Sequence, residues 1–365
     1  MKLLMLVNWK VEYCDRVPEG KQPPDYYVNG EDYWFYRYFK EDVSVDVADI
    51  HTFPWLEHFE KETLRFYVVQ TLKVLFKLNR YDLIVSHGMQ SGVVLSLIRR
   101  LWKSKAKHIV FDIGAFNSAA ESGAALKLMQ FASKSLDGVI YHTESQAEYY
   151  RRFFPWITDK SIYIPFGTDA AFFSERPREA AAEGREKQAD IPVCRQYILC
   201  IGYAKRDWDT LCRAFDRISG KYGVTLRLIG KTDYPCRNPD MECMDFMPID
   251  ELIEQIRGSL FGVVPLEFFN YSFGQMTLLQ QMALGKAVIA ADVPSMRGYV
   301  QDGETALFYP AGDDEKLAGQ MERLLEEETF RTQIGERAAK AVRETYNEVN
   351  MAGQIEDFFR KIRKG

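Results

Sequence analysis

The chain has 365 residues, of which 47% are hydrophobic and 27% are charged, as in ordinary globular proteins. This length allows two domains, each with a sizeable core. The formal net charge of −5 argues against a general binder of polyanions, so no nucleic-acid partner is expected.

The N-terminal stretch "MKLLMLVNWKVEYC" starts with a short apolar run that turns polar at Asn8. That run is too short for a secretory signal peptide, and it predicts a first β-strand instead. No stretch approaches the roughly 18 apolar residues that a membrane span requires. We therefore expect a cytoplasmic protein.

Six cysteines are spread over the chain, without a C-x-x-C pair and without a histidine at ligand spacing. This arrangement favours free, mostly buried thiols over a structural zinc site. No bound metal is expected.

In the first half, short β-branched runs alternate with amphipathic segments. The segments expected to be strands are 2–7, 82–87, 108–114, 138–143 and 161–167. The segments expected to be helical are 31–39, 60–78, 93–104, 124–136 and 144–154. Strands that are apolar throughout, separated by helices, predict a parallel sheet covered on both faces.

The alternation restarts in the second half. Strands are expected at 196–202, 225–230, 260–266 and 286–292. Helices are expected at 207–219, 249–258, 274–285, about 314–327 and 330–363. The prediction is an α/β protein with two doubly wound halves, whose ligands bind at the carboxyl ends of the strands.

A charged, alanine-rich stretch marks the domain boundary. We expect an N-terminal domain over 1–175, a linker over 176–192 and a C-terminal domain over 193–345. The last helix, 346–365, is a candidate to cross back to the N-terminal domain.

Three glycines punctuate the second half: Gly202 and Gly230 end strands, and Gly274 precedes a helix. Glycine lets the backbone approach a ligand, and a helix N-terminus favours phosphate. The cations Lys205, Arg206 and Lys231 follow strand ends, where a diphosphate would lie. The alternative is ordinary turns with solvated cations. Because no G-x-G-x-x-G or Walker loop occurs, a dehydrogenase or P-loop NTPase is disfavoured.

Two titratable residues stand at strand ends in the first half. His87 follows "DLIVS", and Asp112 ends "HIVFD". Each is a candidate acceptor-side or acid–base group. The alternatives are a hydrogen-bonded structural histidine and an acid that caps the following helix.

Two further segments concern the acceptor. Residues 25–39 are dense in aromatic side chains, which can stack on sugars or lipid chains or can simply pack a helix on the sheet. Residues 99–107 combine Lys and Arg with Trp102 and contain no acid. This basic segment suits either peripheral contact with an anionic membrane surface or a solvated helix face.

The stretches "YILCIGYAKRDWDTLCRAF", "TLRLIG" and "SFGQMTLLQQMALGKAVIAADVPSMRGYVQDGETALFYPAGD" carry a family resemblance. The chain resembles retaining, family-four-like glycosyltransferases of the GT-B fold (glycosyl transferases group 1). The resemblance implies two Rossmann-like domains facing across a cleft. It also implies metal-independent transfer of a hexose from a nucleoside-diphosphate sugar to a glycan, a lipid-linked acceptor or a small molecule. No cofactor is implied besides the donor, for which UDP is favoured over GDP.

In that family a Glu–x7–Glu motif flanks the donor helix, and its two positions here are Ser272 and Gln280. The second position hydrogen-bonds the ribose, for which Gln280 keeps an acceptor oxygen. The first lies near the donor sugar. Tyr203 occupies the usual place of a diphosphate-binding arginine, so Lys205 and Arg206 are the expected substitutes, with Arg206 the stronger choice because its guanidinium can grip two phosphate oxygens.

The expected catalytic residues are Arg206 and Lys205, in the place of the family's diphosphate-binding cations, and His87 and Asp112, which are candidates from their positions at strand ends. The expected donor-binding residues are Gly202, Tyr203, Gly230, Lys231, Met247, Ser272, Phe273, Gly274, Gln275, Met276, Thr277 and Gln280. The two missing acids leave an alternative open, a catalytically inactive GT-B-like binding subunit. A sugar-nucleotide epimerase of the same architecture is a third hypothesis.

Overall fold

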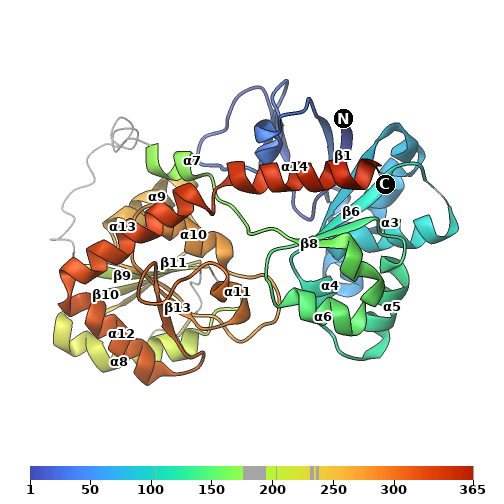
Figure 1. The fold of residues 1–365 in the computed structure, drawn as a ribbon. Coiled ribbons are helices and arrows are strands. Elements are labelled where there is room, and N and C mark those ends of the chain that lie inside the picture. Colours follow the sequence, from blue (N-terminus) through green and yellow to red (C-terminus); the bar gives the residue numbers. More distant parts are fainter. Residues whose placement is uncertain (103, 176–194, 203, 231–233, 236–237, 365) are drawn as a thin grey trace. The chain divides into compact units, whose positions relative to one another are not determined.

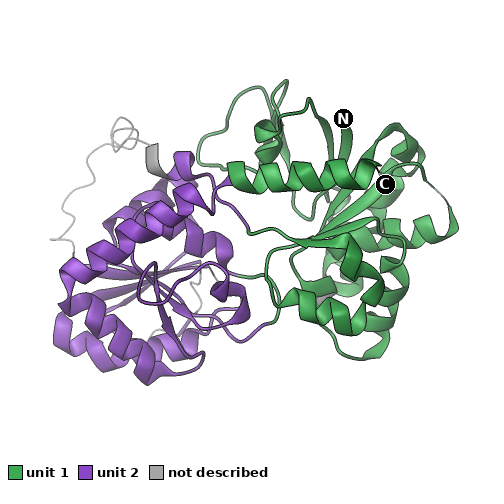
Figure 2. Cartoon of the chain, in the orientation of Figure 1, with its two compact units in different colours: residues 1–165, 270–273, 349–365 green, residues 166–269, 274–348 purple. Residues whose placement is uncertain are grey.

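The computed structural model describes residues 1–365 except 103, 176–194, 203, 231–233, 236–237 and 365. The chain forms two compact units (Figure 2). Unit 1 comprises 1–165, 270–273 and 349–365, and unit 2 comprises 166–269 and 274–348. The expected linker over 176–192 lies outside the described residues.

Unit 1 is built on a parallel six-stranded sheet in the order β4-β1-β5-β6-β7-β8. Its strands are β1 (Lys2–Leu6), β4 (Ser44–Ala48), β5 (Leu83–His87), β6 (Lys107–Asp112), β7 (Gly138–Tyr141) and β8 (Ser161–Tyr163). The central strands are buried almost throughout, which explains why their sequences are apolar without alternation. The parallel sheet predicted for the first half is confirmed.

The helices α1 to α6 of unit 1 alternate along the chain with the strands of its sheet (Figure 1). They are α1 (Pro54–His58), α2 (Val68–Val74), α3 (Met89–Leu101), α4 (Ala115–Ser118), α5 (Gly123–Ser133) and α6 (Gln146–Phe153). The continuous helix expected over 60–78 is wrong. A π-helix at Phe59–Leu64 ends at Arg65, whose φ of 60° is left-handed, and α2 begins only at Val68.

The aromatic segment forms no amphipathic α-helix over 31–39, contrary to expectation. Its only helical residues are a 3-10 helix, η1 (Trp34–Tyr38), which follows a two-stranded parallel sheet of β2 (Glu12–Cys14) and β3 (Tyr26–Val28). Bulky aromatic side chains lose rotamer freedom in an α-helix, and here they pack on one another instead.

The helical segment expected over 330–363 is divided into two helices, the second of which corresponds to the last helix expected over 346–365. Helix α13 (Glu328–Glu344) ends where the backbone of Tyr346 and Glu348 bonds to that of Thr168, and α14 (Glu348–Lys364) follows. Most of α14 belongs to unit 1. There Phe358 covers β7 at Gly138, where a Cβ atom would come within 3.0 Å of its ring.

Unit 2 repeats the plan with the parallel sheet order β11-β10-β9-β12-β13-β14. Its strands are β9 (Tyr197–Ile201), β10 (Thr225–Ile229), β11 (Met241–Met244), β12 (Gly262–Val264), β13 (Val288–Ala291) and β14 (Leu307–Tyr309). Its helices are α7 (Ala170–Glu175), α8 (Trp208–Tyr222), α9 (Ile249–Gly258), α10 (Gln275–Ala283), α11 (Pro294–Arg297), α12 (Asp314–Glu326) and α13. The order places β9 at the centre, with β10 and β12 on either side. The carboxyl ends of these three strands therefore meet at one edge.

Candidate functional site

Two of the predicted glycine turns lie at this edge and are needed there for steric reasons. Gly202 follows β9 with a φ of 97°, and a Cβ atom on it would come within 2.7 Å of Arg206 Nη2. Gly230 follows β10 with a φ of 99°, and a Cβ atom would meet the Phe246 ring at 2.8 Å. Only glycine combines this backbone conformation with such close neighbours.

Arg206 lies at the predicted edge, but its guanidinium is buried, with 6% of the residue exposed. Nε donates to the Ile201 carbonyl at 3.0 Å, Nη1 to the Ala204 carbonyl at 3.3 Å and Nη2 to Thr277 Oγ1 at 2.9 Å. Burial lowers the pKa of Arg206 from its usual value. The Arg206 guanidinium therefore holds the turn after β9 together and brings positive charge to the first turn of α10.

Lys205 is the exposed cation of the same turn. Its φ of 59° turns the backbone left-handed, and its Nζ lies 4.5 Å from the centre of the Phe269 ring. An ammonium beside an aromatic face, at the carboxyl edge of the sheet, can reach an anionic ligand. The other two expected contacts near these turns, Tyr203 and Lys231, lie outside the described residues.

Helix α10 begins at this edge with Gly274 at its N-cap in the left-handed region (φ 85°). Thr277 Oγ1 donates to the Gly274 carbonyl at 3.0 Å. Gln275 is buried and donates to the Ser295 carbonyl at 3.3 Å, whereas Met276 is 48% exposed. The amides of a first helical turn have no partner within the helix and carry the positive end of its dipole. This is the geometry of an anion site.

Two other expected donor residues are set deeper. Gln280 lies one helical turn further along α10 and is 3% exposed. Met247 is half-buried and packs against a cluster formed by Leu199, Ile201, Ile229 and Ile256. Met247 thus closes the core beneath the strand ends.

Ser272 belongs to unit 1, unlike the helix that it precedes. Its hydroxyl lies 3.0 Å from Thr143 Oγ1 and donates to Gln146 Oε1 at 3.2 Å. Ser272 is 7% exposed, and its neighbour Phe273 is half-buried. The position that carries an acid in the resembled family is therefore occupied by a short hydroxyl in a buried hydrogen-bond network.

That network continues to Asp112, which ends β6. Gln146 Nε2 donates to the Asp112 carbonyl at 3.0 Å, and the Tyr150 hydroxyl donates to Asp112 Oδ2 at 2.6 Å. The carboxylate also accepts from the amides of Gly114 and Phe116. Burial raises the pKa of Asp112 to about 6, although these hydrogen bonds act in the opposite direction.

The carboxylate of Asp112 holds an unusual turn. The backbone of α4 and of the residue after it has φ values of 40° at Ala115, 46° at Phe116, 88° at Ser118 and 53° at Ala119. Left-handed backbone at consecutive non-glycine residues is costly and needs surrounding contacts to persist. Asp112 has the contacts of the helix-capping alternative.

His87 ends β5 within an aromatic cluster. Its ring lies 4.6 Å from Trp9 and 6.0 Å from Trp34, centre to centre. Burial lowers the pKa of His87 to about 3, with a smaller contribution from His142, so the imidazole is neutral near pH 7. Nδ1 is buried and forms no hydrogen bond within the described part of the chain. A neutral imidazole of this kind can exchange a hydrogen bond with an incoming hydroxyl.

Sequence reasoning missed Thr143, Gln146 and Tyr150, which join Ser272 to Asp112. Thr, Gln and Tyr are ordinary residues near the start of a helix, so they give no signal in the sequence. Ser272 reaches Thr143 and Gln146 only through hydrogen bonds between residues more than a hundred positions apart. It also missed Trp9 beside His87, for which the available signal was its place in the loop that follows β1.

Among the described residues, no three histidine, cysteine or acidic side chains are grouped so as to hold a metal ion. Over the same residues, every helix is too short or too polar to cross a membrane.

Comparison with known proteins adds to this geometry. Residues 195–327 match the family described as glycosyl transferases group 1. The D-inositol 3-phosphate glycosyltransferase of Corynebacterium glutamicum is 25% identical over 306 residues, which are 76% of this chain and 72% of that protein. The phosphatidyl-myo-inositol mannosyltransferase of Mycobacterium leprae is 37% identical over 84 residues, covering 23% of this chain and 22% of that protein.

Solved structures show the fold. Sucrose-phosphate synthase from Thermosynechococcus elongatus superposes with a TM-score of 0.68 at 18% identity, covering 99% of both chains. The Anabaena protein HepE superposes with a TM-score of 0.69 at 13% identity, covering 99% of this chain and 100% of that one. The predicted GT-B fold is confirmed.

Proposed function

Because residues 195–327 match the glycosyl transferases group 1 family and the chain has the GT-B fold, we propose that it transfers a hexose from a UDP-sugar to an acceptor hydroxyl with retention of configuration. Unit 2 binds the donor and unit 1 binds the acceptor. One observation carries the proposal. At the carboxyl edge of unit 2, the Arg206 guanidinium is hydrogen-bonded to the first turn of α10, beside two glycine turns.

The neighbours support UDP as the nucleotide. HepE structures are described in complex with UDP, with UDP and glucose, and with UDP-glucose. For the acceptor, the relatives named as inositol phosphate glycosyltransferases favour a small polyol or its phosphate among the small-molecule, glycan and lipid-linked possibilities.

The reaction breaks the bond between the sugar C1 and the diphosphate oxygen and forms one between C1 and the acceptor oxygen. Negative charge grows on the departing diphosphate. The N-terminus of α10, Lys205 and the field of Arg206 stabilise that charge. The acceptor proton goes to the leaving phosphate oxygen, so the step consumes no protein carboxylate. We propose that neither a metal nor a cofactor is needed, and that Ser272 and Gln280 are therefore compatible with turnover.

A thermal-shift panel with UDP, GDP and ADP tests the donor, since a ligand that binds the native state raises its melting temperature. UDP is expected to give the largest shift. Incubation with radiolabelled UDP-hexoses and a panel of polyols, sugars and lipid-linked acceptors should then release UDP and form a retained glycoside. A protein that binds UDP without turnover of any hexose donor would be the inactive binding subunit, the alternative that the two neutral residues favour.

A peripheral membrane contact remains a separate proposal. At the end of α3, Leu101 is 92% exposed and Trp102 is 55% exposed, while the Arg100 guanidinium lies 4.8 Å from the Phe131 ring centre. Exposed apolar side chains beside a cation suit an anionic bilayer surface. Co-sedimentation with phosphatidylglycerol vesicles should weaken when Leu101 and Trp102 are both replaced by Ser. Equal binding of this double variant would remove the contact.

A further inference from the structure

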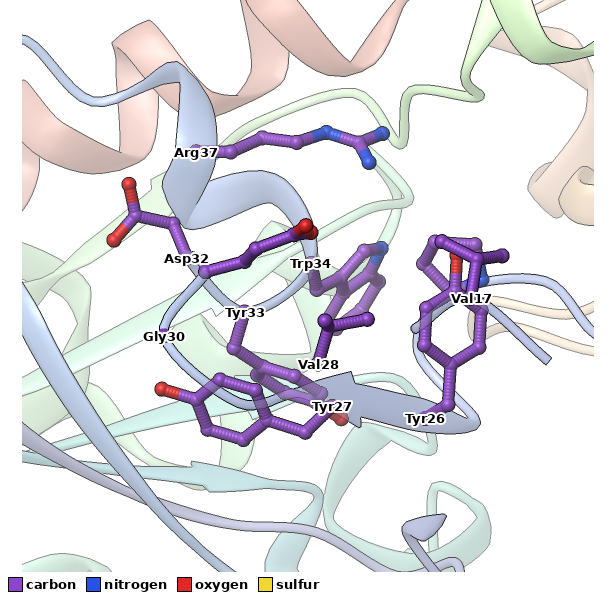
Figure 3. A pocket seen from close by; sticks show the side chains of 11 residues that line it. Val17, Tyr26, Tyr27, Val28, Gly30, Asp32, Tyr33, Trp34 and Arg37 are labelled. Carbon is purple, nitrogen blue, oxygen red and sulfur yellow. The ribbon is translucent and has the colours of Figure 1, made fainter. Parts of the chain in front are cut away.

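Unit 1 contains a cavity that the site described above does not include. It has a volume of about 350 Å³ and lies between the β2–β3 sheet and η1. Figure 3 shows its lining side chains. Four are aromatic: Tyr26, Tyr27, Tyr33 and Trp34. Three are charged: Glu31, Asp32 and Arg37. Aromatic walls with a few polar groups, at the lower end of the volume range of small-ligand sites, are typical of a binding pocket.

The aromatic walls are held in place before any ligand arrives. The Tyr33 hydroxyl donates to the Pro24 carbonyl at 2.7 Å, and the Tyr27 hydroxyl donates to the Val45 carbonyl at 3.0 Å. The two rings lie 5.1 Å apart. Because their polar ends are already bonded within the protein, these tyrosines present fixed apolar surface, which lowers the entropic cost of binding.

Trp34 lines the cavity from a strained backbone position. Its φ of 51° puts a bulky non-glycine residue in the left-handed region, a backbone conformation that persists only where surrounding contacts hold it. The indole is 8% exposed and lies 6.0 Å from both Trp9 and His87, centre to centre. One side chain therefore belongs both to the cavity and to the aromatic cluster around His87.

The charges at the cavity select among ligands. Glu31 and Asp32 supply two carboxylates, against one guanidinium from Arg37. All three side chains are exposed, and in the view of Figure 3 the Arg37 side chain extends above the Trp34 indole. Carboxylates accept from hydroxyls and a guanidinium donates to them. The excess of negative charge disfavours a phosphorylated or otherwise anionic group.

We infer that this cavity binds a neutral, polyhydroxylated ring of the acceptor, a hexose unit or a cyclitol, with the ring's C–H surface on the aromatic walls and its hydroxyls on Asp32, Glu31 and Arg37. The inference rests on the proposed function, since it names the class of acceptor. The inferred acceptor also differs from the one in the names of the inositol phosphate glycosyltransferases, because the cavity prefers an unphosphorylated ring.

The test is saturation-transfer NMR and calorimetry on the full chain, with methyl α-glucoside, methyl α-mannoside, maltose, myo-inositol and myo-inositol phosphate as probes. At least one neutral probe should bind, and myo-inositol phosphate should bind more weakly than myo-inositol. Asp32→Asn and Arg37→Gln should each weaken the neutral probe about tenfold, because each removes hydrogen bonds that involve a charged group. Glu19→Gln makes the same kind of charge change in the same segment outside the cavity lining, and it should leave binding unchanged.

The outcomes separate the two proposals. If no neutral probe binds, if Asp32→Asn and Arg37→Gln both bind it as the wild type does, or if the phosphate ester binds better, the cavity assignment is overturned while UDP-hexose turnover can still stand. If neutral probes bind and respond to these variants but no UDP-hexose is turned over, the cavity stands and the transferase proposal fails.

Discussion

Arg206 Nη2 lies 2.9 Å from Thr277 Oγ1, and that hydroxyl in turn donates to the Gly274 carbonyl at 3.0 Å. A buried guanidinium is thus linked to the N-cap of α10 through one hydroxyl. Thr277→Val removes an acceptor from a charged donor, which costs about 1.5–3 kcal/mol. We expect a melting temperature several degrees lower and weaker UDP binding.

Thr277→Ser is the matched control, because it keeps the hydroxyl and loses only a methyl group. It should retain most of the stability and the UDP affinity. Thermal unfolding and UDP titration measure both quantities. If the Val variant binds UDP as tightly as the Ser variant, the link between Arg206 and α10 has no role in donor binding.

Lys205 offers the opposite combination, an exposed charge at the same edge. Lys205→Met should raise the KM for the UDP-sugar about tenfold and leave the melting temperature nearly unchanged, since an exposed turn cation adds little to stability. Lys316→Met, a change at another exposed lysine near the start of α12, controls for the loss of net charge. A Lys205 variant with the KM of the control would exclude contact between Lys205 and the diphosphate.

Lys205 and Arg206 also show which features of the site can be predicted from the sequence and which cannot. Glycines after apolar runs and a helix start locate the edge of the sheet, because strand ends and helix starts are local properties. Which neighbouring cation points outward is not local. Lys205 takes the left-handed backbone, and Arg206 folds back over Gly202, whose missing Cβ leaves room for the guanidinium.

Ser272 marks a different limit. It stands two residues before Gly274 in sequence, so the sequence groups it with the donor helix. The hydrogen bonds to Thr143 and Gln146 assign it to unit 1 instead. A chain that leaves one unit for four residues and returns carries no compositional signal.

Gln280 tests the ribose contact. Gln280→Met keeps the volume of this buried side chain and removes its acceptor oxygen. If that oxygen accepts from the ribose, UDP should bind several-fold more weakly, whereas inorganic pyrophosphate, which has no ribose, should bind as before. Calorimetric titration with both ligands decides the matter. Equal losses for both would mean that the substitution disturbs α10 generally.

We predict that an acid is not tolerated at the position of Ser272. Ser272→Glu would put a carboxylate into the buried network around Thr143 and Gln146, and within the described part of the chain both of these hydrogen-bond partners are uncharged. We expect a loss of about 3 kcal/mol or more, against about 1 kcal/mol for Ser272→Ala. Urea unfolding compares the two variants. A Glu variant as stable as the Ala variant would show that the site can accommodate the acid of the resembled family.

Buried titratable groups predict how the stability of unit 1 depends on pH. Burial lowers the pKa of His87 from 6.5 to about 3 and of His142 to about 4, and it places that of His108 well below 6.5. The folded histidines stay neutral while the unfolded chain takes up protons below pH 6.5. Stability should therefore be complete above that pH and fall as the pH drops toward 4.

Asp112 acts in the opposite direction. Its pKa rises from 3.8 to about 6, so between these values the folded state holds a proton that the unfolded state releases. The contribution of Asp112 therefore makes the folded state more stable as the pH falls below 6. One carboxyl opposes three imidazoles, and the histidines should dominate. Replacing Asp112 by Asn should make the loss of stability on acidification steeper.

His87→Phe isolates one of the three imidazoles and also tests its role toward the acceptor. The phenyl ring can occupy the aromatic cluster, so the variant should fold and lose less stability between pH 6.5 and 4. Its KM for the acceptor should rise while UDP binding stays unchanged. His58→Gln, which removes an exposed histidine, is the matched control and should leave the acceptor KM unchanged. A Phe variant with unaltered acceptor kinetics but a flatter pH profile would make His87 purely structural.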